Sequence, residues 1–326
     1  MSSPSQSETM TTQEEQESPS VSVSVFAACT ELTKPGITKL VTITALVGLG
    51  LGGLHYGGLG VWDWARLIVG VGLGTAIASG GANALNMWYE SDRDAMMKRT
   101  RVRPIPSRRL SPRFVLLFGL GMTILGCVIL GITAGLLPAL VALLTAASYV
   151  LIYTPLKPIT ITNTLIGAVP GALPTMIGTS AVAPGMGFEP LVEPVGLMLF
   201  CLMFLWQLPH FFAIAWMCRA DYEAGGFRML PIVDPVGNHT AATMVFTSLL
   251  LIPAGLAPLW ITPELSGWAT GIASVLLGGM LVVLSLRFAI KRTDRAARVA
   301  FFGSIIHLPV YLIVLVAEAG VKGLLL

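Results

Sequence analysis

The sequence predicts an all-α membrane protein whose helices form one bundle. Three observations support this prediction. Of the 326 residues, 54% are hydrophobic and only 11% are charged, whereas soluble proteins are about 25% charged. Apolar stretches long enough to cross a bilayer recur along the chain, and the basic residues gather in alternate connections between them, as in polytopic membrane proteins. A conventional soluble enzyme is therefore excluded, and a net charge of +3 gives no indication of a nucleic-acid partner.

The first 30 residues predict a disordered tail. Residues 1–20 are rich in Ser, Thr, Gln and Glu, a composition that buries too little apolar surface to fold. No basic residue precedes an apolar core here, so a standard secretory signal is not indicated, and the Arg-rich, acid-poor character of a transit peptide is also missing. We therefore divide the chain into a tail over residues 1–30 and a membrane domain over residues 31–326, and we favour a bacterial membrane.

Nine apolar stretches follow the tail. About 20 helical residues span the roughly 30 Å hydrocarbon core of a bilayer. Glycine, with 35 residues in the chain, is abundant within these stretches, as close helix packing in lipid requires. The sequence predicts nine transmembrane helices, near residues 38–55, 64–86, 114–133, 136–153, 162–181, 195–217, 240–260, 267–287 and 300–318.

The basic residues also predict the orientation. If the N-terminus is cytoplasmic, eighteen of the twenty Lys and Arg residues fall on the inner side, and only Arg66 and Lys322 fall outside. Positive charge is retained on the cytoplasmic side of membranes. We therefore expect the connections that carry these residues on the cytoplasmic side.

The inner connection after the second stretch carries a pattern that points to chemistry. Asn86, Glu90 and Asp94 are spaced by four, so they share one face of a helix. Two carboxylates and an amide oxygen suit a hard cation such as Mg²⁺, which completes its coordination with waters and substrate phosphates. The sequence therefore predicts a Mg²⁺ site on this face.

A basic cluster follows the stripe directly and includes Lys98, Arg99 and Arg103. Cations beside metal-binding carboxylates are what a diphosphate site requires. The alternative is a loop whose basic residues only enforce topology and pair with nearby acids. Topology does not require carboxylates at helical spacing beside an asparagine, so we favour the diphosphate site.

A second inner connection begins inside the sixth stretch and carries Asp221 near the membrane boundary, as the stripe does. Asp221 is expected either to face the stripe across a cavity and bind a second Mg²⁺ or to pair with Arg219 or Arg228. A third inner segment adds Lys157 with Tyr153 four residues before it, which alone is a weak signal.

These segments together resemble the UbiA superfamily of intramembrane prenyltransferases. Asn86, Glu90 and Asp94 fall on its N-x-x-x-D-x-x-x-D pattern, with glutamate in place of the first aspartate. WQLPHF from Trp206 and DYEAGGFRMLP from Asp221 point, within the superfamily, to the enzymes that farnesylate protohaem IX. Similar segments extend through most of residues 31–310.

The resemblance implies a UbiA-type bundle of nine helices around a membrane-buried cavity. It implies transfer of the farnesyl group of farnesyl diphosphate to the 2-vinyl group of haem B, which gives haem O and diphosphate on the route to haem A. Mg²⁺ is the implied cofactor and the bacterial inner membrane the implied location. A haem A synthase or oxidase assembly factors are the implied protein partners.

The resemblance also implies residue roles. The implied metal ligands, which with Lys157 form the catalytic set, are Asn86, Glu90, Asp94 and Asp221. The implied diphosphate-binding cations are Lys98, Arg99, Arg103 and Lys157. Candidate contacts of the haem or the prenyl chain are Tyr153, Trp206, Gln207, His210 and Tyr222. His210 is either a haem ligand, since imidazole is a common axial ligand, or a histidine hydrogen-bonded within the bundle.

Two other functions stay open at this point. A UbiA-type enzyme that prenylates a quinone precursor or another ring acceptor would differ in the acceptor that an assay reveals. A non-catalytic haem carrier or transporter would not need the predicted Mg²⁺ site, so its activity would survive Asp94→Asn.

Overall fold

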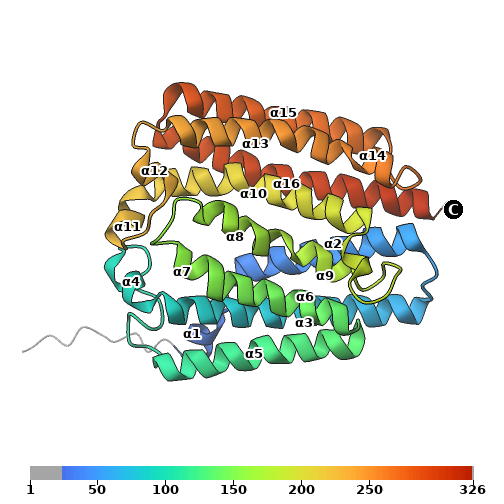
Figure 1. Cartoon of the computed structure of the whole chain (residues 1–326), viewed down its shortest axis with the longest axis horizontal. Helices are drawn as coiled ribbons and strands as arrows, with labels where there is room; N and C mark the ends of the chain where they lie inside the picture. Colours follow the sequence, from blue (N-terminus) through green and yellow to red (C-terminus); the bar gives the residue numbers. More distant parts are fainter. Residues whose placement is uncertain (1–23, 325–326) are drawn as a thin grey trace, which may run out of the picture.

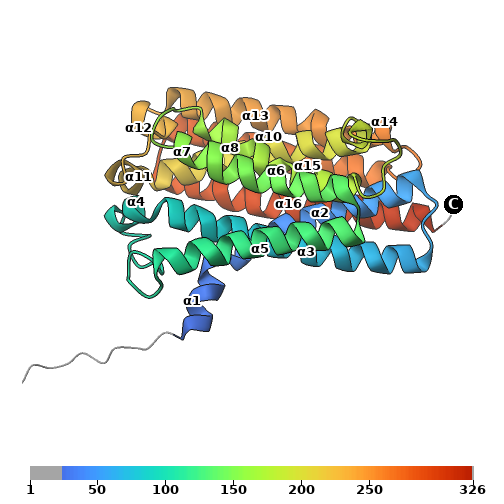
Figure 2. The same ribbon diagram turned by 60° about the horizontal axis from the view of Figure 1, so that its bottom comes forward.

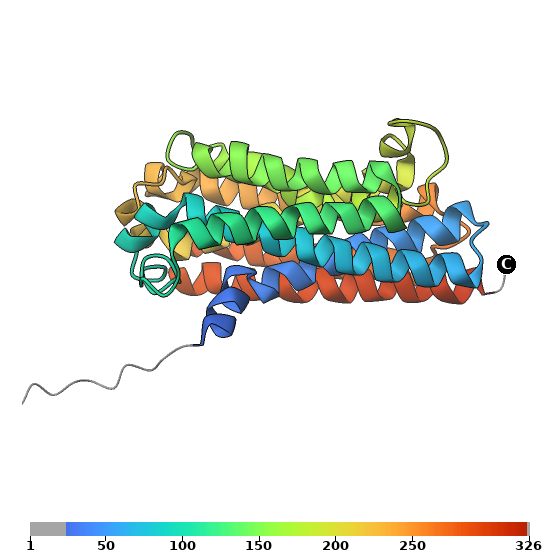
Figure 3. The same ribbon diagram turned by 90° about the horizontal axis from the view of Figure 1, so that it is seen from below.

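The computed structural model describes residues 24–324. Every regular element within this range is a helix, so the predicted all-α fold is confirmed. The long helices lie side by side with nearly parallel axes (Figures 1 and 3). Such an arrangement satisfies each backbone hydrogen bond within its own helix, as the apolar interior of a bilayer demands.

Eight helices are long and apolar enough to cross a membrane. Each contains most of one stretch that the sequence predicts. The fourth is composite: α6 (Leu136–Ala147) continues through a π-helical segment, η1 (Ser148–Tyr153), into α7 (Thr154–Leu156). The other seven are α2 (Pro35–Tyr56), α3 (Val61–Tyr89), α5 (Pro112–Thr133), α10 (Pro194–Met217), α13 (Asn238–Leu256) with the short α14 (Pro258–Ile261), α15 (Trp268–Lys291) and α16 (Asp294–Gly323).

The remaining predicted stretch, residues 162–181, forms two shorter helices. These are α8 (Asn163–Ala172) and α9 (Pro174–Thr179), which meet at Leu173. Proline has no backbone N–H, so Pro174 cannot donate to the preceding turn and interrupts the helical hydrogen bonding between α8 and α9, although Leu173 keeps helical angles. The count of nine membrane-spanning helices stays a prediction.

The connections sort to the two ends of the bundle (Figure 1). One end carries α4 (Ser91–Met96), α11 (Arg219–Ala224) and α12 (Leu230–Val233). The opposite end carries α14, the 3₁₀ turn η2 (Glu189–Leu191) and the end of α16. The two inner connections that the sequence singles out therefore lie at the same end.

Helix α1 (Val25–Leu32) precedes the bundle (Figure 2). The Ser24 side chain caps it by accepting a hydrogen bond from the Ala27 N–H, and Ala28 and Leu32 are buried in a cluster with α3 and α5. Residues 25–30, predicted as part of a disordered tail, are thus helical, because their apolar side chains find a surface on α3. The rest of the predicted tail, residues 1–23, lies outside the described residues.

Small residues bring α3 and α5 close together. A Cβ atom on Gly126 would lie 2.5 Å from the Gly74 carbonyl oxygen, and one on Gly81 would lie 2.6 Å from the Gly119 carbonyl oxygen. Real Cβ atoms do not approach so closely, so a larger residue would push the two helices apart. This packing fixes α3, which carries the predicted metal stripe, against its neighbour.

Candidate active site

A cavity of about 350 Å³ lies between α2, α3, α6, α8 and α10, within the range of roughly 300–1,000 Å³ usual for small-molecule sites. Charged side chains line it near α4 and α11, and apolar, hydroxyl-bearing and aromatic side chains line the remainder. The charged lining residues are Lys34, Glu90, Asp94, Arg99, Arg103 and Lys157.

The predicted metal stripe follows one wall of this cavity. Helix α3 ends at Tyr89 and α4 begins at Ser91, but hydrogen bonds from the Glu90 N–H to the Asn86 carbonyl (3.0 Å) and from the Asp94 N–H to the Glu90 carbonyl (2.8 Å) preserve the helical path. Asn86, Glu90 and Asp94 are buried, with Asp94 0% exposed. The three side chains therefore share one face, as their spacing predicts.

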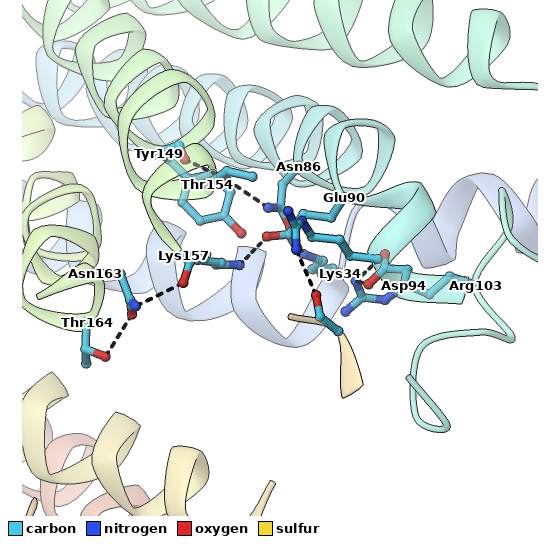
Figure 4. A network of polar contacts seen from close by, with 12 residues as sticks. Lys34, Asn86, Glu90, Asp94, Arg103, Tyr149, Thr154, Lys157, Asn163 and Thr164 are labelled. Atoms are coloured by element: carbon cyan, nitrogen blue, oxygen red, sulfur yellow. Dashed lines mark hydrogen bonds and ion pairs between the residues drawn. The ribbon is translucent and has the colours of Figure 1, made fainter. Parts of the chain in front are cut away.

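A cation contacts each of these three side chains (Figure 4). Lys34 Nζ donates to Asn86 Oδ1 at 2.7 Å, and Lys157 Nζ donates to Glu90 Oε1 at 2.6 Å. The Asn86 amide also donates to Thr154 Oγ1 (3.0 Å). The oxygen atoms predicted to bind a metal thus already have positive partners.

Arg103 completes the set. Its Nη1 donates to both carboxylate oxygens of Asp94, at 2.8 and 2.7 Å, and the Thr100 hydroxyl donates to the Asp94 carbonyl oxygen. With Arg99, the charged end therefore holds four cations against the two carboxylates of Glu90 and Asp94. An excess of buried positive charge favours a polyanionic ligand.

Burial and ion pairing shift the pKa values of Glu90 and Lys157 in opposite directions. Burial lowers the pKa of Lys157, but the Glu90 carboxylate outweighs this and the net pKa is raised. Burial raises the pKa of Glu90, but Lys157 and Lys34 outweigh it and hold the pKa below its ordinary value. Burial, together with Arg103, lowers the pKa of Lys34 to about 7. Glu90 and Lys157 therefore stabilise each other as ions, whereas Lys34 lacks a carboxylate in direct contact.

Lys34 is a site residue that the sequence indicates only as one of the basic residues that predict the orientation. Its backbone is left-handed (φ 45°) directly before Pro35, the first residue of α2. A non-glycine residue in this conformation costs about 1–3 kcal/mol, and such strain clusters at functional sites. This conformation places the Lys34 side chain against Asn86. In the sequence, the sign of this role is a lysine directly before a proline that begins a helix.

The π-helical segment η1 shapes the wall next to the stripe. Pro155 has no N–H to donate to the preceding turn, and the Tyr149 carbonyl accepts hydrogen bonds from both the Thr154 N–H and the Thr154 hydroxyl (2.8 Å for the hydroxyl). Tyr149 and Tyr153 stack with ring centroids 5.7 Å apart, and Lys157 Nζ lies 4.7 Å from the Tyr153 centroid. Single π turns are frequent at functional sites, and this one brings two tyrosines and a lysine to the cavity.

The inner connections interlock over the charged end. Arg93 donates to the Gly225 carbonyl oxygen (2.9 Å) and lies over the Phe227 ring. The Arg228 N–H donates to the Lys157 carbonyl oxygen (2.8 Å). Arg99 lies 5.9 Å from the centroid of Tyr222, another lining residue. The first, second and third inner segments therefore form one cover.

Helix α10 forms the far wall. Met203, Trp206, Gln207 and His210 line the cavity, and their spacing of three and four places them on one helical face. Gln207 Nε2 donates to the Met203 carbonyl (2.9 Å), and Trp206 Nε1 donates to the Ser304 carbonyl of α16 (2.9 Å). These bonds fix both side chains within the bundle.

The hydrogen bonds of Ser304 define the tautomer of His210. The Ser304 hydroxyl donates to the Phe301 carbonyl oxygen (2.6 Å), and His210 Nδ1 lies 2.8 Å from Ser304 Oγ. Since the one hydroxyl proton is committed to Phe301, the Nδ1–H of neutral His210 donates to Ser304. The lone pair therefore lies on Nε2, while the ring stacks on Trp206.

Most of the predicted site residues meet at this cavity. They are Asn86, Glu90, Asp94, Arg99, Arg103, Tyr153, Lys157, Trp206, Gln207, His210 and Tyr222. Lys98 is exposed and, like Asp221, is not part of the lining. Asp221 therefore does not join the stripe, and its role as a second metal ligand stays a prediction.

The protein offers few metal ligands of its own. Within residues 24–324, no group of three or more His, Cys, Asp and Glu side chains is arranged to hold a metal ion. Two carboxylates and one amide oxygen nevertheless fit Mg²⁺, which usually takes one or two carboxylates and completes its shell with water and substrate phosphates. A phosphate-bearing ligand would supply the missing oxygens.

Known proteins resemble this chain in sequence and in fold. Residues 41–306 match the UbiA prenyltransferase family. The protoheme IX farnesyltransferase of Solibacter usitatus (strain Ellin6076) is 38% identical over 299 residues, which cover 89% of this chain and 98% of that protein. The protoheme IX farnesyltransferase of Opitutus terrae is 40% identical over 295 residues, which cover 90% and 95% of the two chains.

A solved UbiA homologue from Archaeoglobus fulgidus, bound to GPP and Mg²⁺, has the same fold. It superimposes with a TM-score of 0.55 at 12% identity and covers 89% of this chain and 99% of the homologue. At this level of identity the likeness concerns the fold alone.

Proposed function

The chain belongs to the UbiA prenyltransferase family, and on this basis we propose that it transfers the farnesyl group of farnesyl diphosphate to the 2-vinyl group of haem B, giving haem O and diphosphate. The proposal draws on relatives named protoheme IX farnesyltransferase that align over nearly their whole length. The observation that carries it in the structure is the cavity itself, with a surplus of cations at one end and an uncharged, aromatic interior.

We assign the diphosphate to the charged end. Lys34, Arg103 and Lys157 contact the Asn86, Asp94 and Glu90 side chains without substrate, and all three line the cavity that the diphosphate would enter. If they turn toward phosphate oxygens, Mg²⁺ would replace them at Glu90 and Asp94, so every buried charge would stay paired, as a low-dielectric site requires. Arg99, at the rim of the same end, adds a fourth cation.

Asn86, Glu90 and Asp94 are the residues that would hold Mg²⁺ between the protein and the diphosphate. A homologue of the same fold was solved with GPP and Mg²⁺ bound, which supports the use of this metal. When bound, the metal neutralises charge that develops on the leaving diphosphate. The protein contributes preorganised cations to the same end, which act strongly because surrounding water is excluded.

The uncharged part of the cavity receives the farnesyl chain and the porphyrin. Burial there protects the allylic cation from solvent while the vinyl group attacks it. On the α10 wall, Trp206 and Gln207 are fixed by hydrogen bonds, and His210 offers a free Nε2. This atom is a suitable axial ligand for the haem iron, and such a bond would hold the porphyrin in the uncharged part of the cavity.

The cellular setting follows from the charge distribution. We assign the end that bears α4, α11 and α12 to the cytoplasmic side of the bacterial inner membrane, because eighteen of the twenty basic residues lie on that side of the predicted topology. Residues 31–326 form the prenyltransferase domain. A haem A synthase or an oxidase assembly factor is the expected recipient of the product.

The test is a direct assay. Membranes that contain the protein are incubated with haem B, farnesyl diphosphate and Mg²⁺, with and without a chelator, and extracted haems are separated and weighed by mass spectrometry. We expect a chelator-sensitive haem heavier by a farnesyl group and a water. A folded protein that yields none would refute the proposal, and prenylation of a quinone precursor instead would reassign the acceptor.

A further inference from the structure

The polar stripe on α3 does not stop at Asn86. Thr75, Ser79 and Asn83 also line the cavity, and their spacing of four, followed by three residues from Asn83 to Asn86, keeps them on the same helical face. The stripe thus continues for about 16 Å below Asn86 at 1.5 Å per residue. This deeper part carries hydroxyl and amide groups but no charge, in a region where a prenyl chain alone would require none.

The hydrogen bonds of Asn83 leave its oxygen available. Asn83 Nδ2 donates to the Thr33 carbonyl (3.2 Å) and to Thr38 Oγ1 (3.3 Å). The Thr38 hydroxyl is itself committed to the Thr33 carbonyl (2.7 Å), so it accepts from Asn83. These contacts fix the amide orientation. Asn83 Oδ1 accepts no hydrogen bond from residues 24–324 and belongs to a side chain on the cavity wall.

Two hydroxyls below Asn83 are weakly held or unpaired. Ser79 Oγ lies 3.4 Å from Thr38 Oγ1, at the limit of a hydrogen bond. Thr75 is 1% exposed, and its hydroxyl oxygen has no partner within the described chain. A buried polar atom without a partner is destabilising unless a ligand or a water satisfies it. A water needs two to four polar partners. Asn83 Oδ1 and the Ser79 hydroxyl are one turn apart and can share one water, whereas Thr75 lies two turns, about 12 Å, from Asn83.

We propose that Asn83, with Ser79 one turn below it, holds the water that becomes the hydroxyl group of the product. This inference rests on the proposed function. The reacting farnesyl carbon is bonded to the diphosphate, so it lies next to Asn86, and Asn83 is the next polar residue about 4.5 Å along the helix. A water that donates to Asn83 Oδ1 keeps a lone pair free to attack.

The bonds and charges of this step balance. The C1–O bond of farnesyl diphosphate breaks, and its electron pair leaves with the diphosphate. The vinyl π electrons form the new C–C bond to C1, which leaves a cation on the carbon beside the porphyrin ring. The bound water forms a C–O bond to that carbon and loses a proton to the departing diphosphate. Without a placed water, the same cation loses a proton from its neighbouring carbon and gives an alkene lighter by one water.

The experiment measures two quantities in the same assay: the sum of all farnesylated haems and the ratio of the hydrated product to the product lighter by one water. Asn83→Leu is expected to lower this ratio by about tenfold, the effect of one lost hydrogen bond to a placed group. Ser79→Ala removes only the weakly held hydroxyl one turn below Asn83, so it should fold normally and lower the ratio less.

Thr145→Val is the matched control. Thr145 lines the same cavity from α6, but its hydroxyl already donates to the Val141 carbonyl (2.7 Å), so its ratio should equal that of the wild type. A lower sum with an unchanged ratio in Asn83→Leu and Ser79→Ala would reveal a purely structural role and overturn the inference. A normal sum with an unchanged ratio would overturn it while leaving the proposed function intact. Failure of the wild type to make any farnesylated haem would refute the proposed function itself.

Discussion

The two ends of one cavity differ in how their polar groups are balanced. At the end near α4, Glu90 and Asp94 are almost completely buried, and each contacts a cation within 2.8 Å. Deeper in the cavity, Asn83, Gln207 and His210 line the walls, and they are neutral groups fixed by hydrogen bonds to neighbouring helices. The first end is a network of ions, and the second is a shaped, uncharged compartment.

The difference follows from the energy of charge in a low dielectric. A charged side chain at mid-bilayer costs about 2.5–3.5 kcal/mol on insertion scales, so ions concentrate near the membrane boundary and in pairs. Neutral hydrogen-bonding groups are tolerated deeper if they are satisfied. We therefore expect leaving-group chemistry at one end and recognition of a large apolar acceptor at the other.

The strongest test of the charged end is Asp94→Asn. This change keeps the side-chain size but removes the charge that faces Arg103, and kcat/KM for farnesyl diphosphate should fall by about a thousandfold. Asp92→Asn is the control, because Asp92 is exposed two residues away. Both variants are assayed with haem B after confirmation of folding. Near wild-type turnover in Asp94→Asn would remove Asp94 from the proposed site.

A second comparison separates two lysines at the same end. Lys157→Met removes the partner of Glu90 and a cation of the cavity wall, so we expect about a hundredfold loss in kcat/KM. Lys98→Met removes an exposed cation that does not line the cavity, and exposed charges contribute little. Steady-state kinetics with varied farnesyl diphosphate would measure both. Equal losses of kcat/KM in the two variants would indicate that Lys98 binds the diphosphate, as the sequence predicts.

In the uncharged compartment, His210→Ala should weaken the binding of the acceptor, haem B, rather than that of the donor, farnesyl diphosphate. We expect the KM for haem B to rise by about tenfold, as for the loss of one specific polar contact, with the KM for farnesyl diphosphate unchanged. Ser304→Ala should raise the KM for haem B less, because it removes only the hydrogen bond that holds the proton on His210 Nδ1. Absorbance titration of haem B would detect loss of the iron–imidazole bond, with His239→Ala, an exposed histidine, as control. Unchanged haem spectra in His210→Ala would contradict ligation.

The smallest expected effect concerns a charge that serves the fold alone. Asp234 accepts hydrogen bonds from the Asn238 and Thr240 amides at the start of α13. Asp234→Ala should lower the free energy of unfolding by about 1 kcal/mol, as for other lost helix caps, without a change in activity. Thermal unfolding in detergent would measure it, and an equal loss of turnover would link Asp234 to the cavity.

The same residue predicts a pH dependence. Burial raises the pKa of Asp234, but the hydrogen bonds from Thr240 and Asn238 hold it below its ordinary value. The stabilisation is therefore complete above the pKa of the unfolded carboxyl group and is lost as the pH falls through the lower folded value. Asp234→Ala should remove this part of the acid sensitivity of unfolding.

The fold was largely predictable because apolar runs of membrane length identify helices almost independently of context. Two features were not. Average hydropathy ignores the break that Pro174 imposes between α8 and α9. Composition also assigned residues 25–30 to the polar tail, although a short apolar helix there needs only a capping serine and a surface on α3.

In the candidate site, helical spacing alone was sufficient to align Asn86, Glu90 and Asp94. Helical spacing could not predict that Tyr222 rather than Asp221 faces the cavity. The packing of the short helix α11 against the other connections determines this. A lone lysine such as Lys34 looks like any topology charge. Asn83 stayed hidden for another reason: neutral polar residues are common in membrane helices, and only the position of the cavity distinguishes this one.

Tyr149, Tyr153 and Lys157 are spaced by four, and all line the cavity. In a regular α-helix each such step overshoots a full turn by about 40°, so two steps would rotate the lysine roughly 80° away from the first tyrosine. The wider π turn over Ser148–Tyr153 underwinds the chain and cancels part of this rotation. The π turn thus keeps the two aromatic rings and the lysine ammonium group aligned along one side of the helix, which faces the cavity.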